Sequence, residues 1–238
     1  MPRVLVTQAI DPAGLTILEA AGLDVVVRQG EAPITRDELL SHLAGCVALI
    51  PMPSDVVDAE ILDAAPLKII ANHAVGVDNV DRVAARRRGI EVTNTPGVLT
   101  EATAELTFAL LLATARRVVE ADAFLRRGAF KGWRPLLLRG FELNGATLGI
   151  VGKGRIGTAV AERAAAFGMQ VIHHNRSSGV RLSSLLAQSD VVSIHCPLTD
   201  STRHLIGEAE LKAMKPTAIL INTARGPVLD EAALVRAL

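Results

Sequence analysis

The sequence predicts an α/β protein built from two parallel-sheet domains, and three observations lead to this prediction. Half of the residues are hydrophobic but only 3% are aromatic, which indicates a core of Ala, Val, Leu and Ile between parallel sheets and helices. Short β-rich runs alternate with helical patterns in units of about twenty residues, as in βαβ crossovers. A chain of 238 residues is also long enough for two domains that each bury a core.

Residues 1–98 are expected to form the first domain. Its first helix is bounded by Asp11 as N-cap, Pro12 at the first helical position and Gly22 at the end. The segment TRDELLSHLAG repeats this start and stop chemistry. Five short β-rich runs predict the strands, and they begin at Arg3, Asp24, Val47, Leu67 and Ile90.

Residues 99–238 are expected to form the second domain. It opens on one long helical pattern over 100–128, with Thr100 as its cap, acidic residues early and arginines late, which suits the helix dipole. After a loop rich in Gly, Trp and Pro, strands are predicted again at TLGIVG, QVIHHN, DVVSIHC and AILINT.

Composition argues against several classes of partner. Lys plus Arg and Asp plus Glu both total 25, so no net field draws in nucleic acid or an anionic membrane. The longest apolar stretch, LTFALLLATA, is shorter than the ~20 residues that span a bilayer, and no secretory signal is visible. Cys46 and Cys196 fit no metal or redox spacing, so buried thiols, no metal site and a cytoplasmic location are expected.

A glycine motif provides the first chemical signal. Gly152, Gly154 and Gly157 have GxGxxG spacing between a predicted strand and a predicted helix. The first glycine allows a tight turn, the second lets a pyrophosphate approach the backbone, and the third lets the helix pack on the strand. The alternative is a tight turn without a ligand. The motif predicts a bound dinucleotide. Together with the strand–helix alternation in both halves of the chain, it leads us to expect two Rossmann-like domains, the first flavodoxin-like and the second dinucleotide-binding.

The end of the next strand bears on the choice of dinucleotide. A carboxylate there would bind the ribose 2′-hydroxyl of NAD, whereas an arginine would accommodate the 2′-phosphate of NADP. The strand QVIHHN ends in Asn175, Arg176 and Ser177, without an acid. NADP is therefore favoured. NAD stays possible, because Arg176 could also be a solvated loop cation.

The histidines give no metal signal. His173 and His174 are adjacent on a strand, so they point to opposite faces and cannot share a metal. His195 lies at a strand end that faces the expected cofactor crevice, where a catalytic role is conceivable and a pocket-wall role is favoured. The remaining three have no ligand spacing and are expected to be structural: His42, His73 and His204.

Five successive motifs resemble the D-isomer-specific 2-hydroxyacid dehydrogenases. They are NHAVGVDNVD, VTNTPGVLTEATAEL, LGIVGKGRIGTAVAERAAAFGMQVIHHNR, HCPLT followed by RHLI, and INTARGPVLDE. Within that family, the segments NTPGVLTEATAEL and HHNRS are most similar in sequence to glyoxylate and hydroxypyruvate reductases. The resemblance implies a substrate domain, a cofactor domain with the active site between them, a homodimer, and a small 2-oxo or 2-hydroxy acid as substrate.

The resemblance also implies roles for particular residues. Arg225 would be the catalytic residue that grips the carboxylate and carbonyl oxygen of the substrate, and a planar fork of donors suits this task. Val75 and Gly76 would offer backbone N–H groups to the same carboxylate, although a plain strand-to-helix turn is a serious alternative for this loop. The cofactor would contact Thr103, Gly152, Gly154, Arg155, Ile156, Gly157, Asn175, Arg176, Ser177, Cys196, Pro197, Thr202, Thr223 and Ala224.

Two features depart from the family pattern. Lys153 stands inside the glycine motif, where an apolar or small residue is more usual. The histidine acid and partner carboxylate of the family lie beyond the last residue of this sequence, so we expect an incomplete second domain, a long exposed hydrophobic sheet edge and poor turnover by this chain alone. The alternatives are a dinucleotide-sensing binding protein, like the corepressors related to this family, and a fragment without function.

Overall fold

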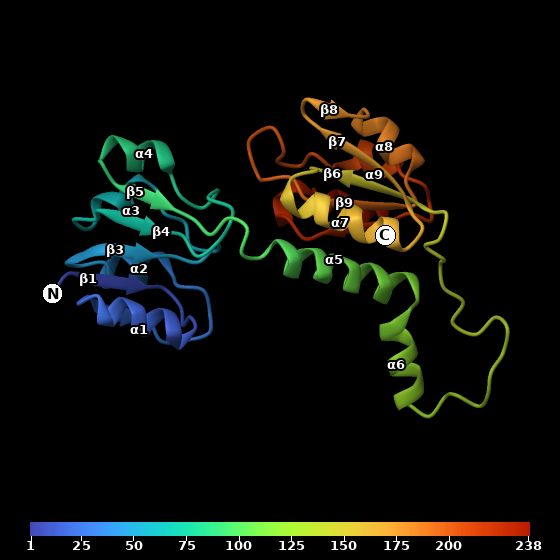
Figure 1. The fold of residues 1–238 in the computed structure, drawn as a ribbon, viewed down its shortest axis with the longest axis horizontal. Coiled ribbons are helices and arrows are strands. Elements are labelled where there is room, and N and C mark those ends of the chain that lie inside the picture. The colour runs from blue at the N-terminus through green and yellow to red at the C-terminus, as the bar shows by residue number, and fades with distance from the viewer. The chain divides into compact units, whose positions relative to one another are not determined.

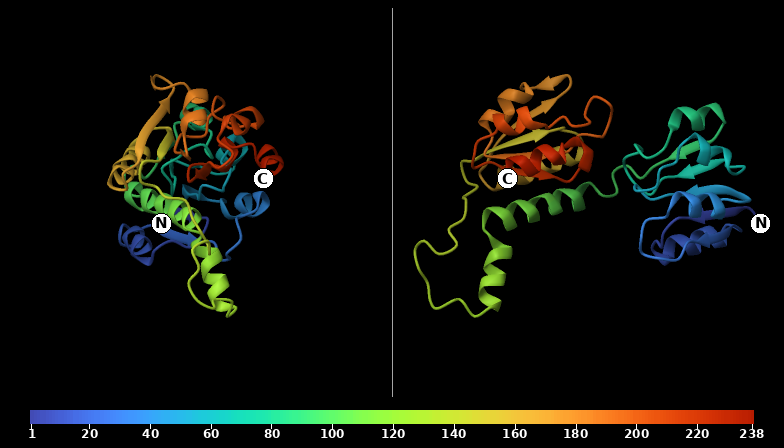
Figure 2. Two further views of the ribbon diagram at one scale, coloured as in Figure 1. Left: turned by 90° about the vertical axis from the view of Figure 1, so that its right-hand side faces the viewer. Right: turned by 180° about the vertical axis from the view of Figure 1, so that it is seen from behind.

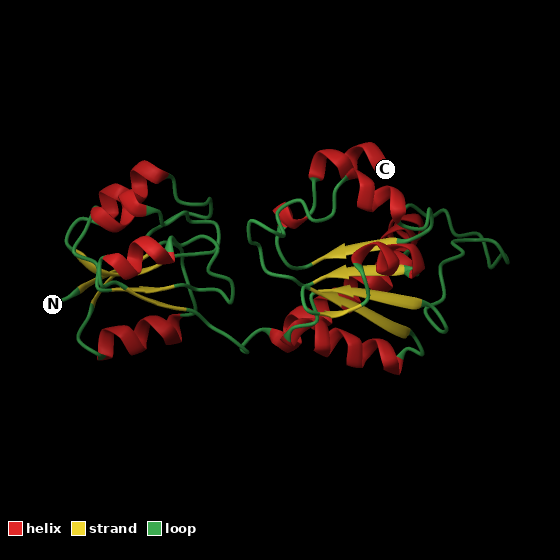
Figure 3. Ribbon diagram, turned by 90° about the horizontal axis from the view of Figure 1, so that it is seen from above, coloured by secondary structure: helices red, strands yellow, loops and turns green.

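A computed structural model describes residues 1–238, which divide into two compact units, Met1–Val98 and Leu99–Leu238 (Figure 1). Each unit holds one five-stranded sheet with helices on both of its faces (Figure 3). The predicted α/β class is therefore confirmed. None of the helices has the length and apolar character needed to cross a bilayer.

The first unit has the strand order β2-β1-β3-β4-β5, and every pairing is parallel. Its strands are β1 (Arg3–Val6), β2 (Asp24–Val27), β3 (Cys46–Ile50), β4 (Ile69–Ala71) and β5 (Glu91–Thr93). Its helices are α1 (Pro12–Ala20), α2 (Arg36–His42), α3 (Ala59–Asp63) and α4 (Arg82–Arg87).

Capping chemistry fixes the ends of these helices, and at α1 it does so as the sequence predicts. The Asp11 carboxylate accepts a hydrogen bond from the backbone N–H of Ala13, and the chain leaves α1 through Gly22 at φ 78°. Asp81 caps α4 in the same way, by accepting from the N–H of Ala84 at 2.8 Å. Local signals alone therefore place these helices correctly.

Aliphatic side chains hold the first sheet to its helices. Leu5, Leu49 and Ile70, on three neighbouring strands, are fully buried together with Ile61 of α3. Each such side chain contributes roughly 1.5–3 kcal/mol when it leaves water. The low aromatic content is thus compatible with a closely packed core.

The second unit has the strand order β10-β9-β6-β7-β8. Its strands are β6 (Thr147–Val151), β7 (Gln170–Asn175), β8 (Ser178–Gly179), β9 (Val191–Ile194) and β10 (Ile219–Asn222). Its helices are α5 (Thr100–Ala115), α6 (Val118–Arg126), α7 (Arg155–Ala166), α8 (Leu182–Gln188), α9 (Glu208–Ala213), the short 3₁₀ helix η1 (Gly226–Val228) and α10 (Glu231–Ala237).

The second sheet is mixed, not wholly parallel as expected. The two-residue turn of Arg176 and Ser177 reverses the chain, so the short β8 runs antiparallel to β7. Gly179 ends β8 at φ 88°, where a Cβ would lie 2.1 Å from the carbonyl oxygen of His173. The opposite edge is β10, a strand of four residues that pairs only with β9.

The expected helix over 100–128 is two helices, α5 and α6, which meet at a bend (Figure 1). Arg117 takes the left-handed conformation between them, at φ 53°. The backbone N–H of Phe141 donates to the carbonyl of Ala115 at 2.7 Å, and this carbonyl would otherwise serve the next helical turn. Tertiary packing therefore breaks a segment whose local pattern is continuous.

Thr100 is not the cap of α5. Leu99 occupies the N-cap position without a side-chain hydrogen bond, and Thr100 is already the first helical residue. The chain enters the helix directly from a turn that ends at Leu99, so the boundary lies one residue earlier than the sequence indicates.

The core of the second unit continues across its sheet. Phe108 and Leu111 of α5 pack with Leu148 and Ile150 of β6 on one side, and α7 shares this cluster. A second cluster, centred on Leu185 of α8, covers the other side. In contrast, α6 buries none of its residues, and it stands off from the sheet with the chain that follows it (Figure 2).

Candidate functional site

The predicted cofactor residues gather at one edge of the second sheet. Gly152, Asn175, His195 and Thr223 stand at the carboxyl ends of β6, β7, β9 and β10. Carboxyl ends of parallel strands share an edge, and ligands of open α/β sheets bind there. The ends of β6 and β9 touch, since a Cβ on Gly152 would lie 2.5 Å from the backbone nitrogen of Cys196.

Glycine is needed at each of the three motif positions for a different physical reason. Gly152 has φ 95° and lies against the end of β9, which excludes any side chain. A Cβ on Gly157 would lie 2.5 Å from the carbonyl oxygen of Gly152, so this glycine lets α7 approach β6. A Cβ on Gly154 would meet nothing within 4 Å. Close packing therefore requires Gly152 and Gly157, whereas Gly154 leaves the space beside it open.

That open position lies at the start of α7. Gly154 is the N-cap, no side chain caps the helix, and its first turn holds no acidic residue. The first N–H groups of a helix have no intrahelical acceptor, and the helix dipole places positive charge there. The turn and the first residues, Arg155 and Ile156, therefore fit the pyrophosphate of a dinucleotide.

The end of β7 is tied to the glycine turn. The side-chain oxygen of Asn175 accepts the backbone N–H of Lys153 at 2.7 Å, and its amide nitrogen donates to the Ser178 hydroxyl at 3.2 Å. Arg176 and Ser177 are exposed at the tip of the turn between β7 and β8. The residue where NAD enzymes have a carboxylate is thus an amide that faces the protein.

His195 is held between two hydroxyls. Its Nε2 lies 2.8 Å from the Ser193 hydroxyl and its Nδ1 lies 3.5 Å from the Thr223 hydroxyl. Burial lowers the pKa of His195 to about 4, so the ring is neutral at physiological pH. A neutral, enclosed imidazole is a poor proton donor, which favours the pocket-wall role over the acid role.

The hydroxyl contacts extend to α5. Thr223 lies 3.0 Å from the hydroxyl of Thr107, which donates to the carbonyl of Thr103 at 2.8 Å. The sequence motifs single out Thr103 and Thr223 but miss the buried Thr107 and Ser193. Thr107 lies four residues after Thr103 and hence on the same helix face, which is the one sequence signal that could have found it.

The segment after β9 forms a compact loop. The Thr202 hydroxyl donates to the carbonyl of Pro197 at 2.7 Å and accepts the backbone N–H of Thr199 at 2.8 Å. Cys196 is a free, buried thiol whose pKa is raised by burial. Cys196 therefore lies directly against Gly152, and Pro197 belongs to the compact loop that follows it.

Arg225 lies three residues after the end of β10 and is half-buried. The side chain of Asn222 accepts the N–H of Ala224 at 3.0 Å and donates to the carbonyl of Arg225 at 2.9 Å. The Arg225 guanidinium donates to the carbonyl of Ala224 at 3.0 Å. A turn closed by one asparagine thus fixes the backbone that carries this arginine at the carboxyl edge.

Val75 and Gly76 lie in the loop that follows β4 in the first unit. The carbonyl of Val75 accepts from the side-chain amide of Asn94 at 2.7 Å, and that of Gly76 accepts from Asn72 at 2.7 Å. The loop is therefore not a plain turn held by backbone bonds alone. Asn72 and Asn94 lie inside the motifs NHAVGVDNVD and VTNTPGVLTEATAEL, but the motifs do not reveal which carbonyls they bind.

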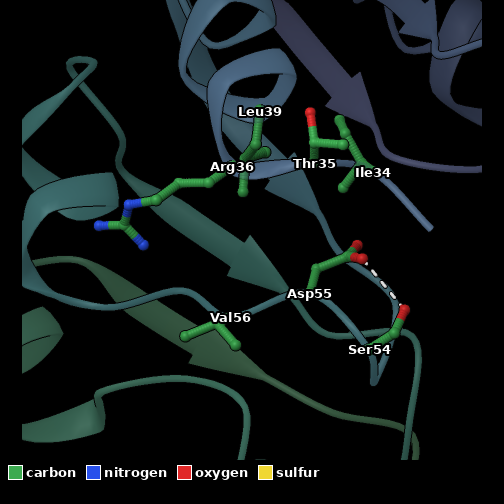
Figure 4. A pocket seen from close by; sticks show the side chains of 7 residues that line it. All are labelled: Ile34, Thr35, Arg36, Leu39, Ser54, Asp55 and Val56. Atoms are coloured by element: carbon green, nitrogen blue, oxygen red, sulfur yellow. Dashed lines mark hydrogen bonds between the residues drawn. The ribbon is translucent and has the colours of Figure 1, made fainter.

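A cavity of about 280 Å³ lies at the carboxyl edge of the first sheet (Figure 4). Its polar side chains already have partners: Asp55 accepts from Thr7 and Met52, and Arg36 pairs with the acidic residues of the adjoining α3 segment. We assign no ligand to it. The lining residues are Ile34, Thr35, Arg36, Leu39, Ser54, Asp55 and Val56.

No group of three or more His, Cys, Asp or Glu side chains is arranged to hold a metal ion. His173 and His174 occupy successive positions of β7, and Nδ1 of His174 lies 2.9 Å from the carbonyl of Val180.

A largely parallel sheet with a glycine turn and an uncapped helix start at its carboxyl edge defines a dinucleotide-binding protein. The family described as "D-isomer specific 2-hydroxyacid dehydrogenase, NAD binding domain" matches residues 108–238. The chain is 52% identical to a glyoxylate reductase of Aeropyrum pernix and 48% identical to one of Korarchaeum cryptofilum, in each case over all of this chain and 75% of the relative.

Solved structures agree with this match. The TT0316 protein of Thermus thermophilus superposes with a TM-score of 0.93 at 53% identity, over 99% of this chain and 78% of that one. A glyoxylate reductase of Paecilomyes thermophila gives 0.84 at 34% identity, over 100% and 77%. The chain belongs to the D-isomer-specific 2-hydroxyacid dehydrogenase family. It is thus an oxidoreductase of 2-hydroxy acids that uses a nicotinamide dinucleotide, as the sequence motifs imply.

Proposed function

We propose that this protein reduces glyoxylate or hydroxypyruvate to the 2-hydroxy acid, with NADPH preferred over NADH. The glycine turn supports the proposal most directly, because Gly154 leaves an open position beside the uncapped start of α7. The names of the archaeal relatives, both glyoxylate reductases, support the choice of a small 2-oxo acid.

The preference for NADPH rests on the end of β7. A ribose 2′-hydroxyl needs an acceptor, but the oxygen of Asn175 is already engaged by the N–H of Lys153. Arg176 is exposed one residue later and offers a positive fork of donors to a 2′-phosphate. Ser177 beside it adds a hydroxyl donor.

Each unit offers donors suited to a carboxylate. In the second unit, Arg225 has a fixed positive charge and planar geometry that would orient and polarise a 2-oxo acid. In the first unit, the loop of Val75 and Gly76 offers backbone N–H groups. We propose both as substrate-binding elements and Arg225 as the catalytic residue.

Reduction needs a hydride, which the dinucleotide supplies, and a proton for the developing alkoxide. His195 does not fill the second role at neutral pH, because its pKa is about 4. We therefore expect this 238-residue chain to bind the dinucleotide well and to turn over slowly.

We further propose that the protein is a homodimer in which a second copy covers α6 and the chain after it. Large apolar side chains are exposed there, among them Val119 at 75%, Leu125 at 63%, Trp133 at 80% and Leu136 at 78%. Exposed apolar side chains gathered on one segment mark interaction sites. Sedimentation should show a dimer for the native chain and a monomer for Trp133→Asp.

A cytoplasmic location remains part of the proposal. Cys46 and Cys196 are free thiols, both buried. Unpaired thiols are typical of proteins from reducing compartments.

The test is NADPH binding, followed by nucleotide fluorescence, and NADPH oxidation with hydroxypyruvate, followed by absorbance, each beside an NADH control. Arg176→Ala should weaken NADPH binding about tenfold and leave NADH binding unchanged, since it removes one charge-assisted contact. Arg87→Ala, at an exposed arginine of the first unit, is the matched control and should change neither.

Equal binding of both nucleotides by the native chain would refute the NADPH preference. Absence of binding to either would refute the role of the glycine turn. Rapid turnover would contradict the expectation for His195 and require another proton donor, and a loss of that turnover in His195→Gln would identify this ring as the donor.

A further inference from the structure

We propose that Asn72, Asn79 and Asn94, together called the amide frame, are positioning residues that orient backbone N–H groups of the 75–77 loop toward a carboxylate. The inference rests on the proposed function, because it takes this loop as a binding element for the 2-oxo acid. The amide frame itself touches no substrate and acts only through the backbone.

Three consecutive carbonyls of the loop are occupied. The carbonyl of Ala74 accepts the backbone N–H of Thr95 at 2.9 Å. The next two accept side-chain amides, Val75 from Asn94 and Gly76 from Asn72, both at 2.7 Å. The carbonyls of Ala74, Val75 and Gly76 therefore all point at hydrogen-bond donors of the same unit.

The occupied carbonyls determine where the N–H groups point. The chain has no cis peptide, and in a trans peptide the C=O and N–H bonds point in opposite directions. The N–H groups of Val75, Gly76 and Val77 therefore face away from the amide frame. None of them donates a hydrogen bond within the chain, so all three remain available to an anion.

Two members of the amide frame, Asn72 and Asn79, are anchored to each other and to a neighbouring segment. Asn72 is only 1% exposed and exchanges two amide hydrogen bonds with Asn79, at 3.1 and 3.0 Å. Asn79 also donates to the carbonyls of Met52 and Asp55, each at 3.1 Å. Position and orientation of the loop are thus tied to the segment that follows β3.

The chemistry of the amide group explains why asparagine stands at these positions. Asn72 donates to Gly76 and also both donates to and accepts from Asn79, which a carboxylate or a hydroxyl of the same size cannot do. An aspartate would place an acceptor against a carbonyl and repel it. The amide frame therefore does more than fill space, because its hydrogen bonds determine how the peptide groups of the 75–77 loop are oriented.

The experiment uses the whole 238-residue chain and observes the backbone N–H signals of residues 75–77 by two-dimensional NMR. The probe is oxamate, an unreactive 2-oxo carboxylate, added stepwise with saturating NADPH. Asn94 is exposed, so Asn94→Ala should fold normally while releasing the carbonyl of Val75. Asn94→Asp keeps the shape and removes the donor, and Asn144→Ala, at an exposed asparagine of the second unit, is the control.

In the native chain, oxamate should shift the signals of Gly76 and Val77. Asn94→Ala and Asn94→Asp should both raise the oxamate dissociation constant about fivefold, the effect of one hydrogen bond, with NADPH affinity and melting temperature unchanged. Oxamate affinity as in the native chain in both variants would overturn the proposal. So would a loss confined to Asn94→Ala, because shape and not donation would then matter.

Failure of the proposed function has a different signature. If oxamate leaves the signals of residues 75–77 unchanged in the native chain, the loop is not a carboxylate-binding element and the amide frame has no ligand to serve. If the native chain responds and the variants respond equally, the substrate role stands and only the positioning role falls.

Discussion

Two loops of this protein present backbone N–H groups after a parallel strand, and they are built in opposite ways. The glycine turn, residues 152–157, is shaped by missing side chains: a Cβ on Gly152 or Gly157 would come within 2.5 Å of a backbone atom. The 72–79 loop is shaped by side chains that are present, since Asn72 and Asn94 occupy its carbonyls.

The contrast explains why one loop is easy to find in a sequence and the other is not. Glycines at fixed spacing act on their own stretch of chain, so the motif contains all of the information. The amide frame joins positions 72, 79 and 94 and the segment after β3, and only folding brings these together. The residues that shape such a loop can therefore lie either within one short segment or at distant positions of the sequence.

The largest expected effect comes from filling the glycine turn. Gly152→Ala places a Cβ against the backbone of Cys196 at a positive φ, so the second unit should lose about 3 kcal/mol or more of its free energy of unfolding. NADPH binding should be lost with it. Urea denaturation measures the first effect and nucleotide fluorescence the second.

Gly226→Ala is the matched control, because its Cβ would meet nothing within 4 Å and its φ is not positive. If Gly152→Ala were as stable as this control, the packing role assigned to the turn would be wrong.

Removal of the amide frame's anchor should have a smaller effect, confined to the first unit. Asn79→Ala removes the donors to the Asp55 carbonyl and to the side-chain oxygen of Asn72, and one of the two donors to the Met52 carbonyl, which should cost about 2 kcal/mol. Hydrogen exchange at residues 75–77 should accelerate, while NADPH binding stays unchanged. Unchanged exchange at these residues would show that the loop holds its shape without the amide frame.

A pH-dependent effect should follow from His195, whose backbone carbon packs beside Gly152. The folded pKa of about 4 lies below the ordinary 6.5, so the unfolded chain binds more protons. This contribution to stability is fully present above pH 6.5 and is lost as the pH falls toward 4. Between pH 7 and pH 4.5 the native chain should lose about 2 kcal/mol more than His195→Gln.

Parallel unfolding curves measured at several pH values would check this difference. Identical pH dependence in the native chain and His195→Gln would mean that the ring titrates normally, which would reopen its role as a proton donor.

The smallest effect on stability is expected at Gly154. Because its Cβ would meet nothing, Gly154→Ala should change the free energy of unfolding by less than about 0.5 kcal/mol. The added methyl group would nevertheless stand where a pyrophosphate approaches, so NADPH binding should fall at least about tenfold. If Gly154→Ala lost stability but kept its NADPH affinity, Gly154 would have the packing role that is assigned here to Gly152.

The sequence was informative where a signal is local. Asp11 caps its helix as expected, and GxGxxG spacing predicts a turn whose three glycines differ in the way the motif implies. It failed where a distant segment intervenes. The single helix expected over 100–128 is broken because Phe141 takes the carbonyl of Ala115, and nothing within 100–128 reveals this.

The site shows the same division. Arg225, Gly154 and Thr223 could be found from motifs, whereas the supporting Thr107 and Ser193 are ordinary hydroxyl residues until the ends of β9 and β10 meet α5. No spacing marks them, because the contact between Thr107 and Thr223 joins positions 116 residues apart.

By itself the sequence determined the α/β class, most strand positions, the Asp11 cap and the glycine turn, because periodicity, capping and backbone freedom act over a few residues. Only the tertiary structure decided the bend at Arg117, the antiparallel β8, the neutral state of His195 and the amide frame around residues 75–77. These features depend on which groups are desolvated and which donors meet which carbonyls, and both are properties of the folded chain.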